Sequence, residues 1–348
     1  MITLRLATAA DDEVLRQFLR GNGMASWVEM SIEREPSFFA GRDFGGEEWA
    51  VIAEEQRDVV GMYSAAVRPV HVNGKPERLG YLGGLRVSPN YRHRIRYLRQ
   101  GYASIRALAP EPAALPWWFT VVVADNRTAR KLLEAGIKGL PAYHPLGEYA
   151  TFALPTARAE RRGLWRRVRE AELPQVVEFH NAKASRFNCS PVLDADLARR
   201  VGLEHFYVFE RGDALEGVAA LWDQRSFKQI VATRYRSPID RLLPLYNLYA
   251  KLFRRIPLPR QGQALDHTFV AFLALNDDAQ SCSAAVIRDL LSHCKTPIAS
   301  VGLHAENPLN RILMRLRPVR YPARVYAVTF GQAAPSCDRP IQPEAAFL

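Results

Sequence analysis

The sequence predicts an α/β protein in which two successive domains each fold around a mixed sheet of parallel and antiparallel strands. Two observations support this fold class. The chain has 348 residues, which is too long for one ordinary core and suits two domains. Elements in the first half follow the order strand, helix, three strands, helix, strand, helix, strand, and the second half runs through a similar order.

In the first half, alternating or continuous apolar runs indicate strands, and apolar residues three or four positions apart indicate helices. Strands are predicted over residues 2–7, 49–54, 59–72, 77–87, 117–124 and 149–154. Helices are predicted near residues 14–19, 92–108 and 126–135. Residues 21–46 are expected to be irregular.

The second half repeats this order behind a helix that begins near Val176. Strands are predicted over residues 206–210, 215–222, 229–234, 268–275, 298–304 and 325–330, and helices over 281–293 and 307–316. The two halves are most alike where 122–127 matches 303–308, because both strand ends pass through Ala, an acid and Asn into a helix. We therefore predict a duplicated fold.

Composition shifts suggest the domain boundaries. We predict a first domain over residues 1–155, a polar, basic linker over 156–167, a second domain over 168–332 and a C-terminal tail over 333–348. Residues 238–263 have no counterpart in the first half, and their leucines and tyrosines predict an amphipathic helix followed by Arg254-Arg255. Such a helix either packs against the protein, which we favour, or lies on a lipid surface.

The overall composition is that of a soluble globular protein, with 48% apolar and 24% charged residues. No apolar run approaches the roughly 20 residues that span a bilayer, and we expect no signal peptide and a cytoplasmic location. The four cysteines form no C-x-x-C pair, so reduced thiols are expected. The net charge of +11 suits a polyanionic partner such as nucleic acid, a membrane surface or CoA, although solvated arginines explain it more simply.

Residues 80–99 carry the clearest chemical signal. A strand runs into Val87-x-Pro89, then into a short arginine-containing loop and a helix. The first turn of a helix presents unpaired N–H groups and a partial positive charge, so it binds phosphates well. Arg92, Arg94 and Arg96 add full charges beside this turn. The segment therefore predicts a pyrophosphate site.

This strand-to-helix junction resembles the central signature of the GNAT superfamily of N-acetyltransferases, V-x-P-x-Y-R-x-R-G-x-G. The matching residues are Val87, Pro89, Tyr91, Arg92 and Arg94. A later segment is similar to the second signature of the family, N-x-x-A-x-x-L-Y-E-K-x-G-F, with one residue missing before the glycine. Its matching residues are Asn126, Ala129, Leu132, Glu134 and Gly136. The resemblance covers residues 2–154 with fair specificity and residues 168–330 weakly.

The resemblance implies two tandem GNAT-like acyl-CoA N-acyltransferase folds, with acetyl-CoA or another acyl-CoA held in a V-shaped opening of the first sheet. Pantetheine would pair with the backbone of Leu85, Arg86 and Val87, and Asn126 would lie beside it. The pyrophosphate would rest on Arg92, His93, Arg94, Ile95, Arg96 and Tyr97. The amine acceptor would enter from the opposite side, and no metal is implied.

Several positions depart from the family pattern. Ile95 and Tyr97 stand where the family has small residues, and their bulk would crowd the turn. Leu133 stands where the family often has the tyrosine that protonates the leaving thiolate, and no carboxylate ends the strand before Val87. The general base and acid therefore stay unassigned. Conceivable candidates are Tyr81, Glu29, Tyr143 and His144.

The corresponding loop of the second half offers smaller residues. Gln280, Ser283 and Ala285 approximate the Q/R-x-x-G-x-G/A pattern and leave the backbone accessible, but Asp277 and Asp278 repel phosphates. We predict a degenerate second domain that completes the acceptor site. An active second domain is the alternative.

The predicted activity is transfer of an acetyl or other acyl group from CoA to an amine on a small molecule or a peptide. One alternative is a catalytically inactive binding protein with the same fold, which the missing tyrosine and carboxylate favour. The other is an aminoacyl-tRNA-dependent transferase, supported by the charge of +11 alone. His304-Ala-Glu306 lacks the further ligands that a metal site needs.

Overall fold

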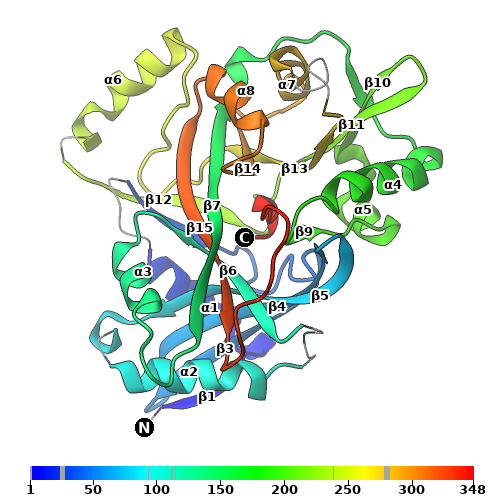
Figure 1. The fold of residues 1–348 in the computed structure, drawn as a ribbon. Coiled ribbons are helices and arrows are strands. Elements are labelled where there is room, and N and C mark those ends of the chain that lie inside the picture. The colour runs from blue at the N-terminus through cyan, green and yellow to red at the C-terminus, as the bar shows by residue number, and fades with distance from the viewer. Residues whose placement is uncertain are drawn as a thin grey trace.

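The computed structural model describes residues 2–23, 28–92, 94–110, 113, 115–237, 239–277 and 283–348 (Figure 1). The strands of the first 155 residues are β1 (Thr3–Leu6), β2 (Val28–Glu33), β3 (Glu47–Glu55), β4 (Asp58–Val72), β5 (Lys75–Val87), β6 (Trp117–Val123) and β7 (Ala142–Pro155). The helices are α1 (Asp12–Gly21), α2 (Ile95–Ala107) and α3 (Arg127–Glu134).

The rest of the chain contains a second set of elements. Its strands are β8 (Trp165–Arg167), β9 (Ser190–Pro191), β10 (Phe206–Arg211), β11 (Ala214–Trp222), β12 (Gln229–Tyr235), β13 (His267–Leu275), β14 (Ile298–His304) and β15 (Val319–Thr329). Its helices are α4 (Leu173–Ala184), α5 (Ala195–Val201), α6 (Ile239–Leu252), α7 (Ala284–Leu291) and α8 (Leu309–Arg315).

These elements confirm the predicted mixed α/β class. Strands β8 and β9 were not predicted, and β7 begins earlier than the predicted residue 149. Residues 21–46, expected to be irregular, contain β2, which pairs with β12 in a separate two-stranded sheet. The alternation of Val28, Met30 and Ile32 is the strand signal that was missed. Helix α5 was not predicted either, although Asp194 caps it by accepting a hydrogen bond from the amide of Leu197 at 2.7 Å.

One large sheet runs through both halves of the molecule in the order β1-β3-β4-β5-β6-β15-β7-β14-β13-β11-β10-β8, with β9 attached to β4. Strand β15, from the C-terminal part of the chain, lies between β6 and β7 and pairs antiparallel with both. Strand β7 in turn pairs with β14. The two halves therefore share strands and do not form two separate sheets (Figure 1).

Two pairs of the named strands are parallel, and in both the pairing is short. Strands β5 and β6 pair only at Gly80–Trp118 and Tyr81–Phe119. Strands β13 and β14 pair over three positions that end at Phe269 and Ser300. Beyond these points the two strands of each pair no longer pair with each other, although each still pairs with its other neighbour. We call the two divergences the first splay (β5/β6) and the second splay (β13/β14).

The hydrophobic cores of the two halves meet along β7. Tyr149 packs with Tyr81 and Phe119 of the first half. Phe152 and Leu154 pack instead with side chains from the second half. No helix among the described residues is long and apolar enough to cross a membrane. The cysteines at 189, 294 and 337 are free thiols, and Cys282 lies outside the described residues.

Candidate functional site

A β-bulge follows the apex of the first splay. The register of β5 against β4 shifts between Met62 and Ser64, which leaves β5 with one extra residue. Gly84 in this stretch has a φ of +62°, and an added Cβ would lie 2.8 Å from the Ser64 hydroxyl oxygen. Only glycine fits both conditions comfortably. The bulge re-aims the strand, so that residues 85–87 run along the open side of the splay.

The free edge of β5 carries two backbone carbonyls. The Arg86 carbonyl lies on the β4 side, because an added Cβ on Gly61 would be 3.4 Å from it. Carbonyls alternate along a strand, so those of Leu85 and Val87 point away from β4. They accept hydrogen bonds from Arg86 Nη1 and Arg92 Nε, both at 3.0 Å. One half-buried guanidinium group, of Arg86, and one exposed group, of Arg92, thus bond the carbonyls on this edge. The amide N–H groups of a ligand could take their place.

The helix that follows β5 begins at Ile95, later than the start predicted at Arg92. Among the described residues, internal hydrogen bonds occupy the amides of Arg92, Arg94 and Tyr97. The first amides of a helix have no partner within the helix, so those of Ile95 and Arg96 are presented at its N-terminus. His93, the remaining predicted contact, lies outside the described residues.

Tyr97 was expected to crowd this turn, but its side chain points elsewhere. Its side chain is buried with Ile2 and Val60, and its hydroxyl donates to Glu55 Oε1 at 2.8 Å. The guanidinium of Arg96 lies 4.7 Å from the centre of the Tyr97 ring. The bulk at position 97 therefore lies in the core, and it supports a positive charge at the start of α2.

Asn126 occupies the N-cap of α3. Its Oδ1 accepts a hydrogen bond from the amide of Ala129 at 3.2 Å, and the residue is exposed. On the adjacent strand Val123 is 40% exposed, as is Leu85 at 44% across the splay. Both sides of the first splay thus present an apolar side chain to solvent.

Of the four conceivable catalytic residues, the structure places Tyr81 at the apex of the first splay. Its ring lies 5.0 Å from that of Phe119, and burial raises its pKa. Tyr143 and His144 lie on β7, where the Tyr143 hydroxyl contacts that of Tyr102 at 2.6 Å. Glu29 lies on β2 in the separate small sheet. The structure does not bring these four together.

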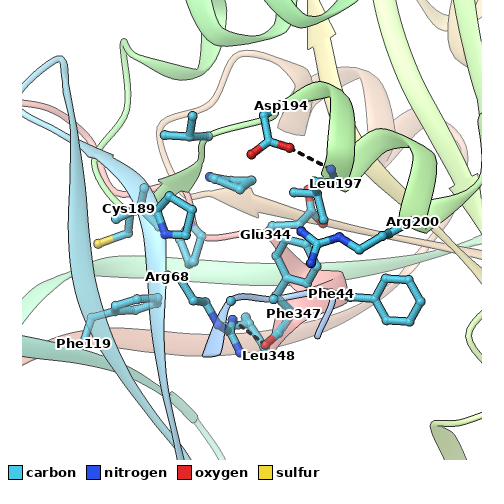
Figure 2. Close-up of a pocket in the computed structure, with 17 residues that line it drawn as sticks. Phe44, Arg68, Phe119, Cys189, Asp194, Leu197, Arg200, Glu344, Phe347 and Leu348 are labelled. Carbon is cyan, nitrogen blue, oxygen red and sulfur yellow. Dashed lines mark hydrogen bonds between the residues drawn. The ribbon is translucent and has the colours of Figure 1, made fainter. Parts of the chain in front are cut away.

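A cavity of about 50 Å³ lies between the two halves, on the inner side of the first apex (Figure 2). Arg68 and Phe119 line it from the first half, and Asp194, Leu197 and Arg200 line it from around α5. The C-terminal segment closes it through Pro343, Glu344, Phe347 and Leu348. Because Phe119 is the apex residue of β6, the cavity reaches the point where β5 and β6 diverge.

Glu344 is the titratable group of this cavity that sequence analysis missed. Its Oε2 accepts a hydrogen bond from the amide of Phe272 at 2.9 Å, and its Oε1 accepts one from Ala346 at 3.2 Å. Burial nevertheless raises the pKa of Glu344 to about 7. A carboxyl group with such a pKa can exchange a proton near neutral pH.

The second splay is filled from within the chain. Gln342 donates from Nε2 to the carbonyl of Gly302 at 2.7 Å and accepts from the amide of His304 at 2.8 Å. Glu344 accepts a hydrogen bond from the amide of Phe272 on β13, the other strand of the splay. A cavity of about 100 Å³ remains between β13, β14 and α4. The strand edges that a pantetheine would use are therefore already occupied here.

The predicted phosphate loop of the second half is described only at its ends. Asp277 forms an ion pair with Arg186, and Ser283 caps α7 by accepting from the amide of Val286 at 3.3 Å. Residues 278–282 lie outside the described residues. Among those that are described, no group of three or more His, Cys, Asp or Glu side chains is placed to hold a metal ion.

The solved structures that match this fold include N-acyltransferases. Saccharomyces cerevisiae N-myristoyltransferase with bound myristoyl-CoA matches over 96% of this chain and 84% of its own, with a TM-score of 0.58 and 13% identity. A second structure of that enzyme matches over 96% and 80%, with a TM-score of 0.60 and 12% identity. A GCN5-related N-acetyltransferase from Anabaena variabilis matches over 94% and 72%, with a TM-score of 0.48 and 10% identity.

No protein-family model and no curated protein matches the chain. The fold is nevertheless of the GNAT type, with two GNAT-like units in tandem, as predicted. At these low identities the likeness concerns the fold. The chemistry has to be argued from the residues of this chain.

Proposed function

We propose that this protein transfers an acyl group from CoA to an amine, with acyl-CoA in the first splay and the acceptor in the cavity between the halves. The observation that carries the proposal is the position of Phe119. This residue forms the apex of the first splay and also lines the cavity. A thioester entering from one side and an amine from the other would meet there.

The first splay fits the cofactor better than the second. Pantetheine contains amides that can replace the guanidinium groups of Arg86 and Arg92 on the carbonyls of Leu85 and Val87. Once released, Arg92 is free to pair with the pyrophosphate beside the N-terminus of α2. In the second splay, Gln342 and Glu344 would have to give up partly buried hydrogen bonds before a ligand could pair with the strands.

Glu344 supplies the proton acceptor in this scheme. An alkyl ammonium must lose a proton before its nitrogen attacks, and a carboxylate of pKa about 7 can take that proton near neutral pH. The nitrogen then forms a bond to the thioester carbonyl carbon, the C–S bond breaks, and CoA leaves as a thiolate. The nitrogen loses its second proton as the amide forms, and water carries that proton to the thiolate sulfur. Glu344 releases the proton that it took to solvent. The products are an amide and free CoA.

Two other functions would use the same fold. A non-catalytic acyl-CoA-binding protein would keep the first splay but show no turnover. An aminoacyl-tRNA-dependent transferase would instead bind RNA with strong salt dependence. Arg92 and Arg96 lie close together at the start of one helix, and this short spacing suits a diphosphate better than a long polyanion.

The test is binding of acetyl-CoA and myristoyl-CoA by calorimetry, followed by release of free CoA thiol when a panel of amines and peptide N-termini is added. Arg92→Ala/Arg96→Ala removes two exposed charges at the proposed pyrophosphate site, and we expect affinity to fall about tenfold or more. Arg106→Ala, at the other end of the same helix, is the matched control. Unchanged acyl-CoA affinity in the double variant would mean that the cofactor does not bind in the first splay.

A further inference from the structure

The outer face of α6 is covered by nothing in the described structure. Six large apolar side chains within 12 residues are between 44% and 70% exposed: Leu242, Leu245, Leu248, Tyr249, Leu252 and Phe253. We call this set the α6 stripe. These six side chains gather on one side of a helix and just beyond its end. Figure 1 shows α6 at the edge of the molecule, apart from the other helices.

The inner face holds the helix firmly in place. Leu243 and Ala250 are buried. The Tyr246 hydroxyl donates to the carbonyl of Ile256 at 3.0 Å. Asn247 exchanges two hydrogen bonds with the backbone of Leu258, both at 2.9 Å. Contacts of the inner face therefore anchor the helix, and we expect substitutions of the leucines in the stripe to leave the fold intact.

Positive charge gathers where the stripe ends. Arg158 donates to the carbonyls of Phe253 and Arg254, at 3.0 and 3.1 Å. Burial lowers the pKa of Arg158, and the nearby charges of Arg317, Arg255 and Arg254 lower it further. Within the described part of the chain, none of these last three arginines forms an ion pair. The acidic residue of α6, Asp240, lies in the first turn, at the opposite end.

We propose that α6 docks the protein on an anionic phospholipid surface, with the stripe in the boundary of the acyl chains and the arginines on the headgroup phosphates. An apolar face that ends in basic residues has the chemistry of an interfacial helix. A second copy of the chain would instead bring another positive patch toward the same face, which like-charge repulsion disfavours. The net charge of +11 acts in the same direction.

Co-sedimentation of the full chain with vesicles tests this proposal. We expect binding to phosphatidylcholine vesicles that contain phosphatidylglycerol, little binding to pure phosphatidylcholine, and weakening by salt. Leu245→Ser/Leu252→Ser should lower the affinity by about tenfold for each leucine. The matched control is Val14→Ser, which alters a side chain that is 45% exposed on α1.

The charges are tested separately with Arg254→Gln/Arg317→Gln, which should cost roughly fivefold for each arginine. Failure of the full chain to bind anionic vesicles would overturn the proposal, as would equal binding by the leucine double variant. Light scattering on the same protein samples measures the oligomeric state, and so tests whether a second copy of the chain covers the stripe instead. A dimer that the leucine substitutions convert to a monomer would assign the stripe to self-association.

Discussion

The guanidinium carbon of Arg68 lies 4.4 Å from the centre of the Tyr81 ring. It is also 5.5 Å from the ring of Phe347, whose carbonyl accepts a hydrogen bond from Arg68 Nη1 at 2.7 Å. One buried arginine thus joins β4, the apex of the first splay and the C-terminal segment. Burial lowers its pKa, and two aromatic faces partly replace the lost water.

Arg68→Ala should therefore destabilise the protein by about 2–4 kcal/mol, since it removes the ring contacts and a hydrogen bond and leaves a cavity. Urea unfolding measures the loss. Arg106→Ala, on the exposed end of α2, should change stability by no more than about 0.5 kcal/mol. Similar values for the two variants would mean that Arg68 does not hold the C-terminal segment in place.

Glu344 gives a pH-dependent prediction. Its pKa is about 7 in the folded protein and 4.5 in its ordinary state, so the folded form holds a proton that the unfolded form loses between these values. Its contribution to stability is therefore greatest below pH 4.5 and declines as pH rises to 7, by up to about 3 kcal/mol. Glu344→Gln should remove this decline, as seen in urea unfolding at several pH values.

The same variant tests catalysis. If Glu344 accepts the ammonium proton, kcat/KM should rise with pH through about 7 in the native enzyme, and the rise should vanish in Glu344→Gln. We expect kcat to fall by about 10²-fold or more while acyl-CoA affinity is retained. A variant with unchanged kcat and the same pH profile would exclude Glu344 as the base.

The sequence allowed the prediction of those parts of the site that are continuous in the chain. The junction from Val87 to Tyr97 could be recognised because its strand, its loop and its helix start are neighbours in sequence. The local periodicity of β4, β5 and β6 was sufficient for the same reason. Tyr97 shows the limit, because its bulk was expected at the turn but is buried against Ile2 and Val60.

The remaining features depend on contacts between distant residues. Nothing in the sequence of β15 indicates that it lies between β6 and β7, where Val325 faces Val121 and Gly147. Glu344 is one of two acidic residues in a tail of low periodicity, and nothing in the sequence sets it apart from Asp338. Its raised pKa and its contact with Phe272 arise only when segments 72 residues apart meet. Hydrophobic periodicity predicts neither the position of β15 in the sheet nor the environment of Glu344, since it depends on local sequence alone.

Gln342 should be important for stability and not for cofactor binding. Gln342→Ala leaves the carbonyl of Gly302 and the amide of His304 without their partner in a partly buried site, and we expect a loss of about 2–4 kcal/mol. Acyl-CoA affinity, measured by calorimetry well below the unfolding temperature, should stay within about twofold. Tighter binding in this variant would instead indicate that Gln342 competes with the ligand in the second splay.

Two glycine-to-alanine variants distinguish the effect of close packing at the first apex from the effect of helix propensity. An added Cβ on Gly80 would lie 2.1 Å from Trp118 Cδ2 on the facing strand, so Gly80→Ala forces the two strands or the indole apart. We expect it to destabilise by at least about 2 kcal/mol and to weaken acyl-CoA binding, because the splay begins one residue later.

Gly101 lies in α2, where an added Cβ would meet nothing within 4 Å. Gly101→Ala should stabilise the protein by about 0.5–1 kcal/mol through the lower entropy of the unfolded chain, with binding unchanged. Thermal unfolding with and without acyl-CoA distinguishes the two variants. If Gly80→Ala were as stable as Gly101→Ala and bound acyl-CoA equally well, the close approach of β5 to β6 would not define the cofactor site. In that case the second splay would become the better candidate.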